Sequence, residues 1–206
     1  MSALSMWSVG EDGLLIELPD VGAVHMLADL IRSHEYADRL VELIPAARTV
    51  MLVGPREVLR RIGDDVRTFE PGTAPGGEPR TVEIPIRYDG VDLDDVASRT
   101  GLSVEEIVSA HSGAAYSVDF FGFSPGLAYI SGTPQAIRIP RRDNPRTRVP
   151  VGAVAIANEY TVIYPAATPG GWSIIGTLEG PPMWDTNADP PTRVGLGDRI
   201  MFRRVG

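Results

Sequence analysis

A segment rich in proline and glycine divides this chain into two parts with different sequence patterns. Six of the eleven residues at 70–80 are proline or glycine, a composition that favours an exposed linker over a helix or strand. We therefore predict a domain boundary in this segment, with one domain over residues 1–78 and a second over residues 79–206.

The first part carries two apolar runs of strand length, each followed by a helical pattern. Residues 14–18 and 49–53 are the apolar runs, and a proline or a glycine closes each of them. Asp20 can cap a helix that reaches residue 33, and residues 57–62 follow a proline that suits a helix start. This order predicts a small N-terminal α/β domain.

The second part begins like the first but then changes to short β runs. Residues 81–88 alternate like a strand, and two helices follow, the first framed by Asp92 and Asp95 and the second capped by Ser103 and Glu106. Proline (18) and glycine (22) make up 40 of the 206 residues, which argues against a helix bundle. The later apolar runs predict a β-barrel or sandwich, and hence an α+β chain; they lie at 117–121, 153–157, 161–164, 173–177 and 198–203.

Composition excludes several kinds of site. The chain has no cysteine, so disulfides, thiolate metal sites and a cysteine nucleophile are ruled out. All 19 basic residues are arginine, which removes Schiff-base lysines and a complete Walker A loop. Only three histidines are present, and we predict no metal site. The net charge of −8 disfavours nucleic acid as a partner.

The sequence gives no sign of a membrane or export segment. No apolar run reaches the roughly 18 residues of a membrane span, and residues 1–11 lack a basic region followed by a hydrophobic core. We expect a cytoplasmic protein with no membrane partner.

One basic segment interrupts an otherwise acidic chain. Residues 138–148 hold five arginines and one aspartate, and nearby prolines limit how far the arginines can move. Arginine binds phosphate and carboxylate groups through two parallel hydrogen bonds, so this segment suits a small anionic substrate or a nucleotide phosphate. The alternative is a solvated loop whose arginines pair with surface acids.

An aromatic turn is the second candidate site. Pro125-Gly126 favours a type II turn, and Phe123 and Tyr129 could line a pocket beside it. The alternative is a buried turn with aromatic core residues. A nucleophilic role for Ser124 would need His111 and an acid brought close by the fold.

A glycine pair and a histidine complete the candidates. Gly170 and Gly171 follow a proline, and their tight turn could expose backbone N–H groups for an anion or oxyanion; alternatively, Trp172 plugs the barrel from a hairpin loop. His111 lies near a predicted helix end, where the helix dipole favours a cationic imidazole and acid–base work; a structural histidine is the alternative.

The order of these motifs resembles one family more than any single motif does. The chain is similar to the family of the 5-oxoprolinase B subunit, which is also called allophanate hydrolase subunit 1. That family includes an inhibitor of the sporulation sensor kinase and one half of the carboxyltransferase part of urea carboxylase. The motifs that carry the resemblance include Gly-Phe-Ser-Pro-Gly-Leu-Ala-Tyr and Pro-Gly-Gly-Trp, and they lie at 122–129, 140–157, 163–165, 169–172 and 197–202.

The resemblance implies a cyclophilin-like barrel after the N-terminal domain and a companion, the C subunit, with a related barrel. Together with a third protein, the A subunit, the family cleaves 5-oxoproline with ATP and water to glutamate, ADP and phosphate, or acts on allophanate. We therefore expect a small anionic amide substrate, ATP with magnesium as co-substrate, no biotin on this chain, and no activity of the chain alone.

Carried over by position, the resemblance implies His111, Arg141 and Arg146 as catalytic residues. The substrate-binding candidates are Phe123, Ser124, Tyr129, Gly170, Gly171 and Trp172.

Two departures and two alternatives remain open. Leu127 stands where the family usually has phenylalanine, and Asn158 where it usually has glycine in a hairpin; asparagine tolerates the left-handed backbone such a hairpin needs. The first alternative function is a regulatory module that inhibits a sensor histidine kinase, with the aromatic residues as interface anchors. A peptidyl-prolyl isomerase would rest on barrel analogy alone.

Overall fold

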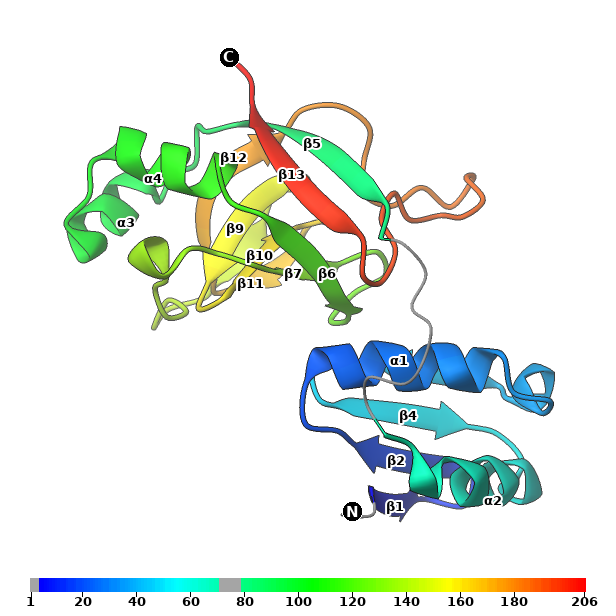
Figure 1. The fold of residues 1–206 in the computed structure, drawn as a ribbon. Coiled ribbons are helices and arrows are strands. Elements are labelled where there is room, and N and C mark those ends of the chain that lie inside the picture. Colours follow the sequence, from blue (N-terminus) through cyan, green and yellow to red (C-terminus); the bar gives the residue numbers. More distant parts are fainter. Residues whose placement is uncertain (1–3, 71–78) are drawn as a thin grey trace. The chain divides into compact units, whose positions relative to one another are not determined.

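The computed structural model describes residues 4–70 and 79–206 (Figure 1). The chain divides into two compact units, Met1–Glu78 and Pro79–Gly206, which we call the N-terminal unit and the barrel unit. The proline- and glycine-rich stretch at 71–78 lies outside the described residues. Nowhere in the described ranges is a helix long and apolar enough to cross a bilayer.

The N-terminal unit is a four-stranded antiparallel sheet with two helices against one face. Asp20 caps the first helix, because its carboxylate accepts a hydrogen bond from the Ala23 N–H at 2.9 Å. The strands follow the order β1-β2-β4-β3. The elements are β1 (Ser5–Val9), β2 (Gly13–Glu17), α1 (Val21–Arg32), β3 (Glu42–Pro45), β4 (Thr49–Val53) and α2 (Arg56–Asp65), with 3₁₀ turns at Ala37–Arg39 and Val66–Thr68.

The four elements predicted for this unit are present, and two strands were missed. β1 and β3 are the edges of the sheet and are largely exposed, so neither carries the apolar run by which β2 and β4 are recognised. The core lies between the helices and the sheet, where Ile16, Val50 and Leu52 pack under Leu27 and Ile62.

Seven strands of the barrel unit close on themselves in the order β10-β7-β6-β13-β5-β12-β9. Neighbouring strands are antiparallel except β13 and β5, which run parallel. The strands are β5 (Thr81–Arg87), β6 (Tyr116–Phe121), β7 (Ala128–Ser131), β9 (Ala153–Ala157), β10 (Tyr160–Ile163), β12 (Ser173–Leu178) and β13 (Arg199–Arg204). The prediction of an α+β chain with a C-terminal barrel is confirmed.

Two short helices, α3 (Leu93–Thr100) and α4 (Val104–Ser112), follow β5. The predicted capping box is present: the Glu106 N–H donates to Ser103 Oγ at 3.3 Å, and the Ser103 N–H donates to the Glu106 carboxylate at 2.8 Å. Gly101 ends α3 in the left-handed conformation, with φ of 75°. A 3₁₀ turn at Gln135–Ile137 also belongs to this unit.

A two-stranded ribbon of β8 (Arg146–Val149) and β11 (Thr168–Gly170) lies outside the barrel. β9 is buried on both faces: Val154 and Ile156 face the interior, whereas Ala153, Ala155 and Ala157 belong to a second cluster outside it. That outer cluster also holds Val149 of β8. Small alanines therefore let a second layer pack against the barrel wall, and this layer forms the site.

Candidate functional site

A pocket of about 170 Å³ opens in this outer layer. Its wall combines aromatic, proline and glycine residues with two arginines. The lining residues are Phe123, Leu127, Tyr129, Arg141, Arg142, Pro145, Val162, Tyr164, Pro169, Gly170, Gly171 and Trp172. Three sequence motifs, far apart along the chain, thus meet at one cavity.

Arg141 is the arginine of the pocket that remains available to a ligand. Its guanidinium lies 5.7 Å from the centroid of the Trp172 ring, a cation–π contact. In the part of the chain that the structure describes, no carboxylate lies within ion-pair distance of Arg141, while its neighbours Arg142 and Arg146 each have one.

Asp92 is the residue that holds those two neighbours in place. Its Oδ1 accepts from Arg142 Nη1 at 2.8 Å and from Arg146 Nη2 at 2.6 Å, and its Oδ2 accepts from the Ile174 N–H at 2.7 Å. The Asp92 side chain is only 4% exposed. Asp92 occupies the N-cap position of α3 but makes no side-chain cap bond. Its carboxylate instead ties the arginine segment to β12.

One carboxylate shared by two guanidinium groups leaves net positive charge beside the pocket. Nε of Arg142 and Nη1 of Arg146 are buried and have no hydrogen-bond partner among the described residues. Burial raises the pKa of the Tyr164 phenol, with a further rise from Tyr129 and an opposing effect of Arg141 and Arg146. The phenol is therefore protonated at neutral pH and can donate a hydrogen bond.

The aromatic wall is held by ring contacts that continue behind the pocket. Tyr129 meets Trp172 edge to face at 5.7 Å and stacks on Phe120 at 4.4 Å. Tyr160 contacts both Phe120 and Tyr129 edge to face. Because each ring is fixed by another, Tyr129 and Trp172 form a rigid aromatic wall on one side of the pocket.

The turn at 122–127 places an aromatic side chain at the pocket edge. The Leu127 N–H donates to the Ser124 carbonyl at 3.1 Å, and Gly126 has φ of 75°, as a type II turn at Pro125-Gly126 requires. Phe123 has φ of 69° and is 66% exposed, an unusual combination for a bulky residue. Ser124 Oγ is buried without a partner among the described residues and is not part of the pocket lining.

The expected tight turn at Gly170-Gly171 is wrong. Gly170 ends β11 opposite Arg146, and the Gly171 carbonyl accepts from the Arg142 N–H at 2.7 Å. A Cβ on Gly170 would lie 2.4 Å from the Tyr164 hydroxyl, so glycine is needed here for close approach, not for a turn. The error arose because the pairing of β11 with β8 depends on residues about twenty positions away.

His111 lies inside the barrel and not at the pocket. It is fully buried, with Nδ1 hydrogen-bonded to the Tyr88 hydroxyl at 2.8 Å and Nε2 to Thr161 Oγ1 at 3.0 Å. Thr161 and the pocket residue Val162 are consecutive on β10 and point to opposite faces of the barrel wall. The strand therefore separates His111 from the pocket.

The expectation of a cationic imidazole is also wrong. Burial lowers the pKa of His111 to about 3, because the protein interior disfavours the charged form more strongly than the helix dipole favours it. The ring stacks on Phe202 at 4.7 Å. These contacts favour the structural alternative for His111.

Within residues 4–70 and 79–206, no group of three or more histidine or acidic side chains is placed to hold a metal ion. The side chains of the pocket offer anion binding by Arg141, aromatic contact with Trp172 and Tyr129, and hydrogen bonding by Tyr164.

Comparison with known proteins identifies the family. Residues 4–194 match the family model described as carboxyltransferase domain, subdomain C and D. The chain belongs to this family. The B subunit of 5-oxoprolinase from Escherichia coli O157:H7 is 36% identical to it, over 98% of this chain and 96% of that protein. The resemblance seen in the motifs is thus confirmed.

Solved structures agree with the family assignment. The crystal structure of the protein TTHA0988 superposes with a TM-score of 0.82 at 32% identity and covers 95% of this chain. This chain spans 40% of the length of TTHA0988. The Kluyveromyces lactis urea amidolyase covers 98% of this chain with a TM-score of 0.73, but its identity of 16% supports the fold alone.

For this member of the carboxyltransferase family, the fold gathers six of the predicted site residues at the pocket. They are Phe123, Tyr129, Arg141, Gly170, Gly171 and Trp172. Arg146 lies behind the pocket on Asp92, Ser124 lies in the adjoining turn, and His111 lies inside the barrel.

Sequence reasoning missed Asp92, Arg142 and Tyr164. Arg142 and Tyr164 stood inside quoted motifs, whereas Asp92 carried no signal of its buried role.

Proposed function

We propose that this chain is the B subunit of an ATP-dependent lactam hydrolase, which converts 5-oxoproline, ATP and water to glutamate, ADP and phosphate. A relative of that name matches nearly the whole chain. The observation that carries the proposal is the pocket in which Arg141, which has no ion pair among the described residues, lies over Trp172. It offers a cation for a carboxylate and a flat face for a small ring.

The size of the pocket supports a small substrate. At about 170 Å³ it is smaller than the roughly 300–1,000 Å³ of pockets that hold drug-sized ligands. A single five-membered lactam with one carboxylate suits this volume, and a nucleotide does not. In this arrangement Arg141 binds the carboxylate, and the ring lies against the wall formed by Trp172 and Tyr129.

The arginines fixed by Asp92 have a different task. Arg142 and Arg146 place positive charge behind the ring, and the Tyr164 phenol lines the same pocket and interacts electrostatically with Arg146 and Tyr129. Together they provide a donor and a field that stabilise negative charge developing on the amide oxygen. We propose that they position and polarise the lactam while Arg141 binds it.

ATP and magnesium belong to another part of the complex in this proposal. The chain lacks lysine and so has no Walker A loop, and the pocket is too small for a nucleotide. We propose that ATP binds on a companion protein or at its interface with the barrel, so that this chain is inactive alone. The chain described here contributes the lactam site.

The test is a reconstituted complex of this chain with its two companions, the C and A subunits. It measures ATP hydrolysis that depends on 5-oxoproline, together with glutamate formed. Arg141→Ala removes a charged hydrogen bond of about 1.5–3 kcal/mol and should raise KM for 5-oxoproline by about 10- to 100-fold. Arg148→Ala, in the same segment but outside the pocket, should leave KM within about twofold.

Three outcomes separate the possibilities. An Arg141→Ala enzyme with unchanged KM would remove the substrate role of the pocket. An equal rise of KM in the Arg141→Ala and Arg148→Ala enzymes would mean that any change in this arginine segment weakens substrate binding, and not the loss of Arg141 in particular. Failure of the wild-type complex to couple ATP hydrolysis to any lactam or amide would remove the proposed reaction.

A second candidate function is a regulatory module that binds a sensor histidine kinase. The observation that favours it is Phe123, 66% exposed and held outward by left-handed backbone at the pocket edge, because exposed aromatic anchors dominate many interfaces. In a kinase autophosphorylation assay, inhibition by the wild-type chain that Phe123→Ala abolishes would support this function. Absence of inhibition would exclude it for the kinase tested.

A further inference from the structure

A second cavity, unrelated to the pocket above, lies in the N-terminal unit. It has a volume of about 350 Å³ and follows the groove between α2 and the strands β1 and β2. Its floor is apolar and holds Met6, Leu14 and Leu59, with Gly63 of α2 leaving space above Leu14. Its rim is charged: it carries Arg56, Arg60 and Arg67 together with Asp64 and Glu11.

The arginines of this rim are only weakly neutralised. Arg60 and Arg67 share one carboxylate, that of Asp64, at 3.4 Å and 3.2 Å. In the part of the chain that the structure describes, Arg56 has no ion pair. The side chains of Arg60, Asp64 and Arg67 are about half exposed or more, and such surface pairs contribute little free energy. An incoming carboxylate can therefore replace Asp64 at low cost.

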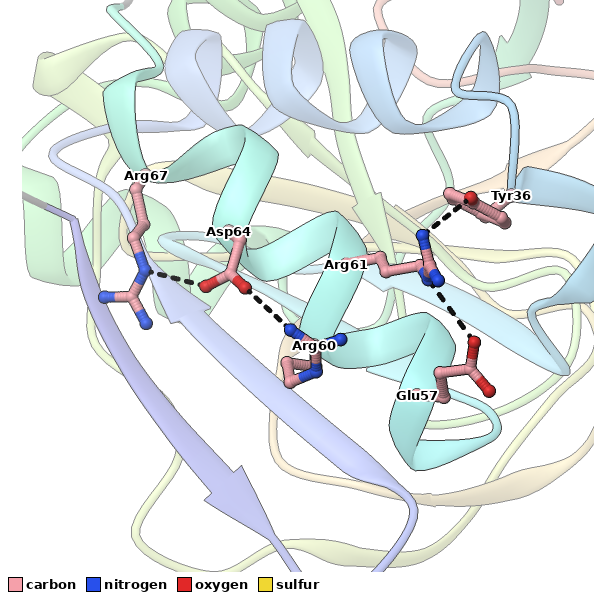
Figure 2. Close-up of polar contacts among 6 residues, drawn as sticks. All are labelled: Tyr36, Glu57, Arg60, Arg61, Asp64 and Arg67. Atoms are coloured by element: carbon pink, nitrogen blue, oxygen red, sulfur yellow. Dashed lines mark hydrogen bonds and ion pairs between the residues drawn. The ribbon is translucent and has the colours of Figure 1, made fainter.

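Figure 2 shows two distinct sets of arginine contacts on α2 and the 3₁₀ turn that follows it. Arg60, Asp64 and Arg67 form one set along the helix, whereas Arg61 points away from them toward Glu57 and Tyr36. At 100° per residue, positions 56 and 60 lie about 40° apart on the helical wheel of α2, and Arg67 follows in the 3₁₀ turn after α2, paired with Asp64. All three arginines line the groove, and we call them the arginine stripe.

The strand beside this stripe is an unprotected sheet edge. Among the described strands, β1 pairs only with β2. The opposite edge, β3, carries Glu42 and Pro45, two residue types that block pairing with another strand. β1 reads Ser-Met-Trp-Ser-Val and has neither a charge nor a proline. Its outward backbone groups can therefore accept one more strand.

The two faces of β1 differ in chemistry. Met6 and Ser8 face the groove and its arginines. Trp7 and Val9 point to the other face, where they are 48% and 43% exposed. Trp7 is paired in register with Leu15, Leu15 with Met51, and Met51 with Ile44, so an apolar row crosses the whole sheet on this face.

We propose that β1 and α2 together bind an extended segment of a partner polypeptide whose residues alternate between acidic and apolar. The segment adds a strand to the β1 edge. Its acidic side chains reach Arg56, Arg60 and Arg67 on the helix side, and its apolar side chains extend the row that ends at Trp7. Main-chain pairing gives affinity, and the alternation of side chains gives specificity.

A second copy of this chain is a poorer occupant. A twofold axis would pair two β1 strands edge to edge. The two arginine stripes would then either lie on the same face of the joined sheet, where like charges repel, or lie on opposite faces without an acidic partner. β1 itself has no acidic residue to offer them. Charge complementarity therefore favours a different, acidic chain.

The test uses the full chain and a blocked peptide, acetyl-Glu-Val-Glu-Val-Glu-Val-Glu-amide, with hydrogen exchange as readout. We expect the peptide to slow exchange of the Ser5–Val9 amides, and salt to weaken binding. Arg56→Gln with Arg60→Gln should weaken binding at least about tenfold, because two charged hydrogen bonds are lost. Arg61→Gln, on the same helix but outside the groove, is the matched control and should bind like the wild type.

Four results would overturn the proposal. They are no protection of β1, equal binding by the double arginine variant, equal binding of the lysine counterpart of the peptide, and protection of β1 without peptide that rises with protein concentration. The last result would show that a second copy occupies the edge. Circular dichroism of each variant confirms that loss of binding does not reflect loss of the fold.

Discussion

The two units place their polar groups differently. Among the residues that the structure describes, every buried polar or charged side chain lies in the barrel unit, including Asp92, His111 and Asp119. The buried side chains of the N-terminal unit are all apolar. The N-terminal unit thus has an apolar core with its charges at the surface, whereas the barrel unit also buries polar and charged side chains, of which Asp92 supports the pocket.

Two arginine clusters make this difference concrete. In each, one aspartate accepts from two arginines: Asp92 from Arg142 and Arg146, and Asp64 from Arg60 and Arg67. The Asp92 side chain is 4% exposed and that of Asp64 is 49% exposed. Burial turns the same contact into a fixed support, because removing one partner leaves uncompensated charge. At the surface, water replaces the lost partner, and the arginines stay available to ligands.

The largest expected effect is that of Asp92→Ala. It removes the carboxylate that holds Arg142 and Arg146 and leaves the Ile174 N–H without its acceptor. We expect the free energy of unfolding of the barrel unit to fall by about 3–5 kcal/mol, measured by urea denaturation. If the free energy of unfolding fell by less than about 1 kcal/mol, the buried Asp92 cluster would contribute no more than an exposed ion pair. The contrast between the Asp92 and Asp64 clusters would then be wrong.

His111 provides a second, pH-dependent signal from the barrel interior. The pKa of His111 in the folded state is about 3, below the ordinary value near 6.5. As pH falls below about 6.5, the unfolded chain binds a proton at His111 and the folded chain does not. The free energy of unfolding therefore decreases as pH falls through this range. Between pH 7.5 and 5.5, the wild type should lose about 1.4 kcal/mol more than His111→Gln.

Urea denaturation of both proteins at the two pH values measures this difference. His25 and His34 are present in both proteins, so their contributions cancel. The same pH dependence in wild type and variant would mean that His111 is protonated in the folded state and is not sealed in the barrel.

The smallest expected effect is that of Asp64→Ala, the surface counterpart of Asp92→Ala. We expect a change in unfolding free energy below about 0.5 kcal/mol. Because the groove arginines then lack this carboxylate, the acidic peptide should bind about twofold more tightly, measured by the same exchange assay. A loss of stability above about 1 kcal/mol would show that this exposed cluster supports the fold.

Local sequence signals predicted the elements that depend on neighbouring residues. The Asp20 cap, the Ser103–Glu106 capping box and the Pro125-Gly126 turn each involve residues within three positions of one another. The ribbon of β8 and β11 was missed, because its strands are short and gain their stability from each other and from the alanine face of β9.

The site shows the same division. The arginine and aromatic residues were recognisable by type, and six predicted residues do line one pocket. Their roles were not recognisable, because five arginines within 138–148 look alike in sequence. Only the structure distinguishes them: Arg142 and Arg146 pair with the buried Asp92, whereas Arg141 lies over Trp172 at the pocket.

The amino-acid sequence by itself determined the family, the mixed fold with its barrel, and the set of residue types that could bind an anion. Tertiary structure decided that Asp92, fifty or more positions from its arginines, fixes two of them, and that His111 is a neutral core residue. The physical reason is that hydrogen-bond partners and desolvation depend on distances in space, and a barrel that closes on itself brings together residues whose separation along the chain carries no such information.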